Sequence, residues 1–469
     1  MQTAVAAPDT SKAAAPATPL GYRRRQALRW AVLKARVNEY LAFDAAVLQA
    51  LVGSVGLVAA WVLGAVGRTR QSFALLSKLH RADFLSWANR RAERLAQAAA
   101  AGTPHPLLDA YRDHVERTPP GPTTAKFFDD PTRLFGSMAT VLKSPSGGEK
   151  GVLVLNYGYV YAMFLKLFDA DRVTSRYHLV LEPSWCGFCD ANILSYGRLG
   201  VPVFVQSGEP RDTAFLQRLG SNLVAVPVAG NWWVDHRVFR PMPGVAKDAD
   251  VVMVAGWAGY KRHFAFFDAL RRLRIRGVKL RAVLIGYPVG STMAEVRDLA
   301  RLYGVADQVE CYERLTPAEV NRHMNRARVN LLWSRREGFN RVIVEGMFAG
   351  TPCVLRAGFN YGHPYPYINE YTGRYATETG LPDTLLTMVE RADRFDPRSW
   401  VMANMTCQKG TELLGRAIGE KAVELGQPWS GGLAVKVSYL SGMGYWDEAD
   451  RMRFDGDYAF LRSAIRPKL

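Results

Sequence analysis

Residues 337–354, Glu-Gly-Phe-Asn-Arg-Val-Ile-Val-Glu-Gly-Met-Phe-Ala-Gly-Thr-Pro-Cys-Val, carry the pattern from which the fold can be inferred. An apolar strand is expected to end at Ser334, Gly338 permits a tight turn, and a helix is expected to begin near Asn340. The free N–H groups at such a helix start favour an anion such as a diphosphate. Glu345 lies about one turn past the helix start, where a carboxylate can bind a pair of vicinal hydroxyls.

Strands and helices alternate on both sides of this stretch, which predicts an α/β fold. Strands are expected at 250–255, 280–286, 308–312, 329–334 and 352–356, with helices of ten to fifteen residues between them. A shorter series is expected at 151–156, 178–181, 201–205 and 222–228. The spacing predicts two Rossmann-like, doubly wound domains that face a cleft, with their ligands at the carboxyl ends of the strands.

The stretch resembles the Glu-x7-Glu signature of family 4 (group 1) retaining glycosyltransferases. The likeness includes the glycine and aromatic residue after the first acid and Gly350-Thr351-Pro352 after the second. Upstream, residues 234–241 (Val-Asp-His-Arg-Val-Phe-Arg-Pro) look like the segment of this family that enters its interdomain linker. The resemblance implies a GT-B fold, a nucleotide-sugar as co-substrate, and transfer without a metal, another cofactor or a protein nucleophile.

The resemblance also implies roles for residues of the stretch. Glu337 would act in catalysis by contacting hydroxyls of the transferred sugar, and Glu345 would bind the ribose hydroxyls. Gly338 and the backbone amides of Phe339 and Asn340 would contact the sugar and its phosphate.

A second donor-binding segment is expected after the strand at 250–255. Gly256 closes that strand, and Lys261 and Arg262 open the following helix. The family usually has an arginine directly after the glycine, but this sequence has Trp257 there. We expect Lys261 to bind the diphosphate, with Arg262 as a substitute and with Arg335 or Arg336 completing the positive charge.

Candidates for the acceptor side lie in the first strand series. Tyr157 and Gly158 follow the strand at 151–156. Glu182 and His178 are expected beside one strand end, where they could contact an acceptor, although a core or surface role remains an alternative for both.

Two other motifs point to different chemistry. Residues 185–189 (Trp-Cys-Gly-Phe-Cys) resemble a thioredoxin active site, so a redox module using Cys186 and Cys189 is an alternative to an acceptor-side loop. The Asp-x-Asp pairs at 248–250 and 455–457 resemble a metal-binding motif but are interpreted as solvated acids. The sequence contains neither a P-loop nor a zinc-spaced His/Cys cluster, and no metal is expected.

The N-terminal region contains an apolar segment. No charged residue lies between Ala45 and Gly67, so this segment could span a membrane, lie in its interface or form a buried helix. Basic residues occur on both sides of it, and the net charge of +17 favours anionic partners. No nucleic-acid-binding motif accompanies that charge. The five cysteines and the absence of a signal-peptide pattern favour the cytoplasm, at the inner face of the cell membrane.

These observations predict five regions. They are a disordered tail (1–20), a helical arm (21–145), an acceptor domain (146–245), a nucleotide-sugar domain (246–420) and a tail that packs back on the acceptor domain (421–469). The predicted function is transfer of a hexosyl-type sugar to a saccharide or lipid-linked saccharide in surface polysaccharide or glycoconjugate synthesis. The alternatives are a soluble glucan synthase-like transferase and a non-catalytic or redox module.

Overall fold

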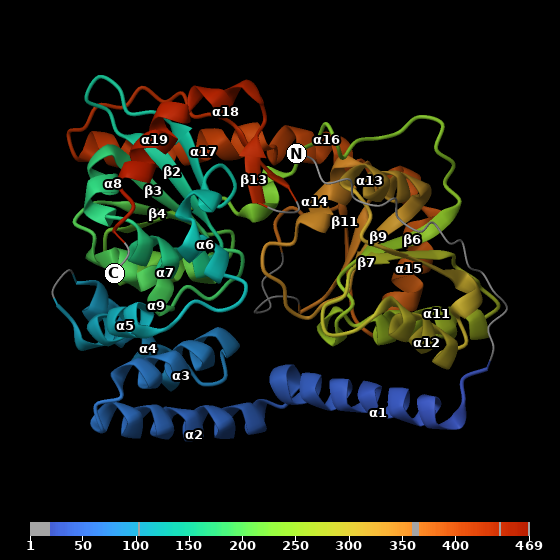
Figure 1. Ribbon diagram of the computed structural model, residues 1–469. Coiled ribbons are helices and arrows are strands. Elements are labelled where there is room, and N and C mark those ends of the chain that lie inside the picture. Colours follow the sequence, from blue (N-terminus) through green and yellow to red (C-terminus); the bar gives the residue numbers. More distant parts are fainter. Residues whose placement is uncertain (1–18, 102–103, 359–364, 440–441, 468–469) are drawn as a thin grey trace. The chain divides into compact units, whose positions relative to one another are not determined.

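The computed structural model describes residues 19–101, 104–358, 365–439 and 442–467 (Figure 1). The chain divides into two compact units. Of the described residues, those up to Tyr40 and those between His236 and Asn404 form unit 1, and those between Leu41 and Asp235 and from Met405 onward form unit 2.

Unit 1 is built on a sheet of six parallel strands in the order β11-β10-β9-β6-β7-β8. The strands are β6 (Ala249–Val254), β7 (Ala282–Gly286), β8 (Val309–Glu313), β9 (Ala327–Leu332), β10 (Cys353–Arg356) and β11 (Gly373–Ala376). The chain runs outward from β6 through β7 to β8, and then returns to the other side of β6 with β9. This is the Rossmann strand order, and its direction reverses between β6 and β9.

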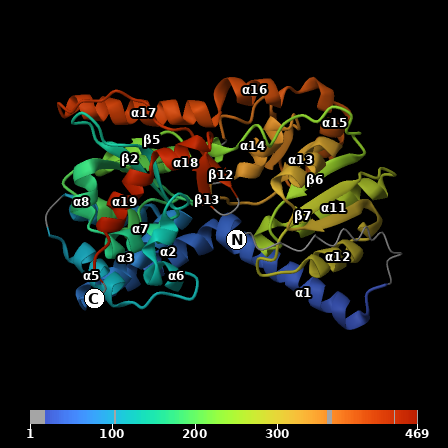
Figure 2. The same ribbon diagram turned by 45° about the horizontal axis from the view of Figure 1, so that its top comes forward.

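Helices cover both faces of this sheet. They are α11 (His263–Ile275), α12 (Met293–Leu302), α13 (Pro317–Arg326), α14 (Arg341–Phe348), α15 (Leu381–Glu390) and α16 (Pro397–Asn404). Figure 2 shows α11 and α12 on one face and α13 and α14 on the other. The N-terminal helix α1 (Tyr22–Glu39) also belongs to unit 1, where Arg24 Nε donates to Asp298 of α12 at 2.8 Å.

Local sequence explains several of the boundaries. Thr292 precedes α12 and Thr316 precedes α13, each as the N-cap residue of a complete capping box. Their reciprocal partners are Glu295 and Glu319. The predicted strands of this unit all form, within one or two residues of the expected positions.

Unit 2 is built on a five-stranded sheet whose order, β1-β2-β3-β4-β5, follows the sequence. The strands are β1 (Ala139–Lys143), β2 (Gly151–Asn156), β3 (Tyr177–Glu182), β4 (Val203–Gln206) and β5 (Leu223–Val226). β1 pairs antiparallel with β2 and the other pairs are parallel. The sheet therefore begins inside the region expected to be a helical arm, because the short apolar run of β1 is buried and adds an edge strand.

The connections of this sheet are short helices. They are α7 (Gly158–Leu167), α8 (Ala170–Arg176), α9 (Ala191–Leu194) and α10 (Pro210–Leu219), with 3-10 turns at Ser195–Arg198 and Gly230–Trp233.

Further helices, and one pair of short strands, lie before and after the sheet of unit 2 in the sequence. Before it come the π-helix Tyr40–Asp44, α2 (Ala46–Ala65), α3 (Thr69–Ala82), α4 (Ser86–Ala100), α5 (Pro106–Arg117) and α6 (Ala125–Asp129). After unit 1 come α17 (Cys407–Glu424), β12 (Lys436–Tyr439), β13 (Gly442–Tyr445), α18 (Ala449–Arg453) and α19 (Asp455–Ser463). The chain thus returns to unit 2 at Met405, earlier than the expected boundary at 421.

Two Rossmann-like α/β units in one chain are the basis of the GT-B fold, so the predicted fold class is confirmed. The doubly wound strand order is present in unit 1 but not in unit 2, whose strand order does not reverse.

Candidate functional site

The candidate site lies at the carboxyl edge of the unit 1 sheet, where the strand order reverses. β6 and β9 are adjacent and parallel, and Val252 pairs in register with Asn330. The segments that follow the two strands therefore emerge side by side at the same edge. In doubly wound sheets this position binds ligands.

The structure brings together the two residues predicted to act in catalysis. The ammonium group of Lys261 donates to Oε1 of Glu337, and Ser334 Oγ donates to the same oxygen at 2.5 Å. Glu337 is buried and the Lys261 side chain is only 12% exposed. Ser334, which sequence reasoning did not include in the site, lies two residues after the end of β9 and orients the carboxylate.

Arg262 lies next to Lys261 in sequence but has different partners. Its guanidinium is buried, with Nε donating to both carboxylate oxygens of Glu39 at 2.8 and 3.0 Å and Nη2 donating to Glu378 at 2.5 Å. Arg262 also has a left-handed backbone, with φ of 61°. Because two carboxylates already neutralise this guanidinium, its position does not support the expectation that Arg262 substitutes for Lys261 at a diphosphate.

Helix α14 begins at the position expected from the signature. The Asn340 side chain caps it by accepting from the Ile343 N–H at 3.3 Å. Glu345 lies on the second turn and is half-buried. Burial raises the pKa of its carboxyl above the ordinary value, and the positive charge of Arg341 acts in the opposite direction.

The turn between β9 and α14 has a partner that the sequence did not indicate. Tyr365, which lies beyond β10, donates from its hydroxyl to the Gly338 carbonyl at 3.4 Å. Phe339 is half-buried in the same turn. Arg335 and Arg336 also lie in this segment and are half-buried.

The segment after β6 contains a buried tryptophan. Gly256 is buried, and a Cβ atom there would lie 3.0 Å from Val289. Trp257 occupies the place where an arginine was expected by resemblance; it is fully buried and donates from Nε1 to Glu313 at 2.8 Å. Trp257 therefore contributes packing and a hydrogen bond, and Lys261 is the cation of this segment that lies against Glu337.

Two of the acceptor-side candidates meet at the carboxyl edge of the unit 2 sheet. Tyr157 follows β2, and its N–H donates to the Glu182 carbonyl at 3.1 Å. Its φ of 68° is unusual for a non-glycine residue and is a form of strain that often marks functional sites. Gly158 begins α7 directly after it.

Glu182 ends β3 and forms a buried ion pair. Its carboxylate lies 2.7 Å from Nζ of Lys436 on β12, and both side chains are almost completely buried. The ammonium also lies 4.3 Å from the centre of the Trp233 ring. The Glu182 charge thus has a partner within unit 2.

His178 is not at that edge, and the expectation that it shares a strand end with Glu182 is wrong. It is the second residue of β3, about 13 Å along the strand from Glu182. Its ring packs edge-on against Phe204 and Trp429, and burial lowers its pKa to about 4. His178 is a neutral core residue.

The Cys186–Cys189 segment is a buried loop. Both thiols are reduced and buried, and burial raises the pKa of Cys189, whereas a reactive thiolate needs a lowered one. The Asp212 carboxylate accepts from the N–H groups of Gly187 and Phe188 at 2.8 and 2.9 Å. These contacts favour a structural loop over the redox alternative.

Three of the four acids in the Asp-x-Asp pairs are engaged in structural contacts, and the interpretation as solvated acids is wrong for Asp457, which is buried. Asp248 forms an ion pair with Arg326 at 2.7 Å, and Asp250 accepts from the Arg281 N–H at 2.7 Å. Asp457 accepts from the hydroxyls of Ser144 and Tyr177. Among the residues that the structure describes, no group of three or more His, Cys, Asp or Glu could hold a metal ion.

Comparison with known proteins gives a family match over the region that contains the site. Residues 239–390 match the model of the family "Glycosyl transferases group 1". No curated protein sequence matches the chain significantly.

Several solved structures are similar to the chain. Sucrose-phosphate synthase from Thermosynechococcus elongatus has 16% identity and a TM-score of 0.46, with 58% of this chain and 74% of that one covered. Anabaena HepE in complex with UDP and glucose has 14% identity and a TM-score of 0.45, with 57% and 78% covered. The lipopolysaccharide outer core galactosyltransferase WaaB has 15% identity and a TM-score of 0.39, with 56% and 72% covered.

The matched residues extend from Phe239 to Glu390 and include Lys261, Glu337 and Glu345. The chain therefore carries a glycosyl transferases group 1 domain on a GT-B fold.

Proposed function

We propose that unit 1 binds a nucleotide-sugar and that the chain transfers the sugar, with retention of configuration, to a saccharide or lipid-linked saccharide. The observation that carries this proposal is the meeting of Lys261, Glu337 and the start of α14 at the edge where the unit 1 strand order reverses. The family match over residues 239–390 supports it.

The donor would be held in three parts. The N–H groups in the first turn of α14 and the Lys261 ammonium would bind the diphosphate, because both favour negative charge. Glu345 would accept hydrogen bonds from the ribose hydroxyls. A hydroxyl ligand would replace part of the solvation that the half-buried Glu345 carboxylate lacks.

Lys261 would change partners during the reaction. Without donor, its charge is balanced by Glu337. A diphosphate carries more negative charge than one carboxylate, so it would draw the ammonium and leave Glu337 to the sugar hydroxyls. As the bond between sugar and phosphate breaks, Lys261 would stabilise the departing phosphate and Glu337 the positive charge on the sugar.

The acceptor proton would pass to an oxygen of the departing phosphate on the same face of the sugar. This step needs neither a protein nucleophile nor a metal ion. Tyr157 and Gly158, at the carboxyl edge of the unit 2 sheet, are the candidates for acceptor contacts, since Glu182 is held by Lys436. We propose that the protein acts in the cytoplasm at the membrane, in synthesis of a surface polysaccharide or glycoconjugate.

A thermal-shift screen tests the proposal. UDP, GDP, ADP and CMP sugars would be added to wild type, to Lys261→Met and to the control Lys409→Met, which changes an exposed lysine of unit 2. A ligand at 100 times its Kd stabilises by about 2.7 kcal/mol, which is roughly 5–10 °C for a domain of this size. One sugar nucleotide should produce that shift in wild type and in the control, with a smaller shift in Lys261→Met. Absence of a shift with every nucleotide would contradict the proposal.

A further inference from the structure

Helix α2 has its small residues turned inward and its large apolar residues turned outward. Gly53 and Ala60 are buried, and a Cβ atom at Gly53 would lie 2.7 Å from Leu85. The opposite side is exposed and apolar, with Val47, Leu51, Val55, Val58, Trp61 and Val62 between 46% and 75% exposed. A helix on a protein surface in water has the reverse arrangement. The exposed side of α2 therefore requires an apolar environment.

The helix is long and apolar enough to cross a membrane, with 20 residues and a mean hydropathy of 2.1. Its packing argues for a different position. α2 lies against α3, and Ser72 Oγ donates to the Ala60 carbonyl at 2.6 Å. α3 exposes Gln71 and Lys78, which a spanning α2 would carry into the hydrocarbon. A helix lying in the plane of the interface avoids this, because only its outward side enters the lipid.

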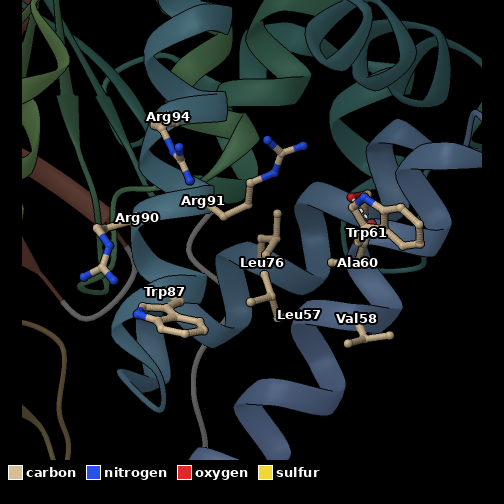
Figure 3. Close-up of a pocket in the computed structure, with 10 residues that line it drawn as sticks. Leu57, Val58, Ala60, Trp61, Leu76, Trp87, Arg90, Arg91 and Arg94 are labelled. Carbon is tan, nitrogen blue, oxygen red and sulfur yellow. Dashed lines mark hydrogen bonds between the residues drawn. The ribbon is translucent and has the colours of Figure 1, made fainter.

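A cavity of about 600 Å³ opens beside this apolar side, between α2, α3 and α4. Figure 3 shows Trp61 on α2 and Trp87 on α4 at the cavity, together with Arg90, Arg91 and Arg94 of α4. Tryptophan prefers the boundary between lipid and water, and the arginine guanidinium matches the geometry of phosphate oxygens. The cavity thus combines the groups that a phosphate-bearing lipid needs.

The three arginines are exposed and form no ion pair or side-chain hydrogen bond within the part of the chain that the structure describes. The acid on the same helix, Glu93, is occupied elsewhere, by His80 at 3.0 Å and Arg218 at 2.8 Å. Three positive charges therefore line the cavity, and no carboxylate of the described residues forms an ion pair with them.

We propose that α2 lies in the interface of an anionic bilayer, with its outward side among the acyl chains, and that the arginine cavity binds the phosphate of a phospholipid headgroup. Charge complementarity and a continuous apolar side support this placement, which does not depend on the transferase activity.

Vesicle sedimentation tests the headgroup site. The full chain would be mixed with neutral phosphatidylcholine vesicles and with vesicles containing 30% phosphatidylglycerol. The variant Arg90→Gln/Arg91→Gln/Arg94→Gln would be compared with the control Lys409→Gln/Arg416→Gln/Arg462→Gln, which removes three exposed charges from α17 and α19. Each arginine near an anionic surface contributes about five-fold in affinity. The cavity variant should lose about 100-fold on anionic vesicles, and the control should stay within about three-fold of wild type.

Two results of this experiment would overturn the headgroup site. One is wild-type affinity in the cavity variant, and the other is an equal loss in both triple variants, which would mean unspecific attraction by net charge. Circular dichroism would confirm that both variants fold. Nucleotide binding, measured separately, should be unchanged in both, so failure of the lipid site and failure of the proposed transferase function are distinguishable.

The depth of α2 in the bilayer distinguishes an interfacial helix from a spanning one. All five native cysteines are buried, so an environment-sensitive fluorophore can be attached selectively to Val47→Cys, Val55→Cys or Val62→Cys. These positions share the outward side and extend over about 22 Å of helix. Quenching by lipids labelled at shallow and deep carbons should give one shallow depth for all three. A deep middle position with shallow ends would mean that the helix spans, and no change on adding vesicles would mean that α2 does not meet lipid; either overturns the proposal.

Discussion

Replacing Lys436 with methionine should destabilise unit 2 strongly, because it leaves the Glu182 carboxylate buried without its ion-pair partner. Lys436 is fully buried, its Nζ is 2.7 Å from Glu182, and the Glu182 side chain is 4% exposed. Methionine keeps much of the apolar volume of lysine, so the change removes the charge with little loss of packing.

The size of the effect follows from this burial. Removing one partner of a buried ion pair costs about 3–5 kcal/mol, because the remaining charge has lost its compensation. The loss of the contact between the ammonium and the Trp233 ring, at 4.3 Å, adds to the cost. The double variant Glu182→Gln/Lys436→Met should cost less than Lys436→Met alone, since no charge is then buried. The solvent-accessible pair Lys421–Glu424 on α17, whose charged groups are 2.8 Å apart, is the matched control. Lys421→Met should cost at most about 1 kcal/mol.

The assay is differential scanning calorimetry, which separates the transitions of two units, together with urea unfolding. The transition temperature of a unit of this size falls by about 2–4 °C per kcal/mol of lost stability, so Lys436→Met should lower the unit 2 transition by roughly 6–20 °C. A shift no larger than that of Lys421→Met would refute the reasoning, as would additive losses in the double variant. If Glu182 instead binds the acceptor, Glu182→Gln would raise KM for the acceptor and leave the transition temperature unchanged.

Three further predictions concern other parts of the molecule. Glu39→Gln should destabilise unit 1 by about 1–3 kcal/mol in urea unfolding. The loss should exceed that of Glu378→Gln, because Glu39 accepts two hydrogen bonds from Arg262 and is the less exposed carboxylate. A larger loss in Glu378→Gln would contradict the burial argument. Below pH 6.5 the free energy of unfolding of unit 2 should fall by up to about 1.4 kcal/mol per pH unit, down to about pH 4. The reason is that His178 is neutral in the folded state, where its pKa is lowered to about 4. His178→Phe should flatten this pH dependence, and an unchanged slope would show that other groups cause it. Sugar transfer should continue in excess EDTA, whereas complete loss restored by manganese would indicate a metal-dependent mechanism.

Much of unit 1 could be predicted from the sequence because its signals are local. Each strand is a short apolar run, the helices α12, α13 and α14 each have a capping side chain, and the glutamate signature lies in one segment of 18 residues. The sequence assigned Lys261 and Glu337 to one donor site, and the Rossmann order does place the ends of β6 and β9 together; the direct hydrogen bond between the two side chains was not predicted.

The features that sequence reasoning missed depend on contacts between distant segments. Arg262 binds Glu39 from a position 223 residues away, and no local pattern links the two. The partner of Glu182 on β12 is similarly remote. The position of His178 could have been predicted: it is the first residue of the strand expected at 178–181 and Glu182 follows the last, so the two lie at opposite ends of that strand.

Nucleotide binding by two glutamate variants tests the central claim, the donor site of unit 1, most directly. Calorimetry with the free nucleoside diphosphate selected by the screen would be combined with steady-state kinetics on Glu337→Gln and Glu345→Gln. Glu345→Gln should weaken the nucleotide by about 10- to 150-fold, since losing a charge-assisted hydrogen bond costs roughly 1.5–3 kcal/mol. Glu337→Gln should bind the nucleotide as wild type does but turn over more slowly, because its partner is the charge that develops on the sugar. Wild-type affinity and wild-type turnover in both variants would contradict the account.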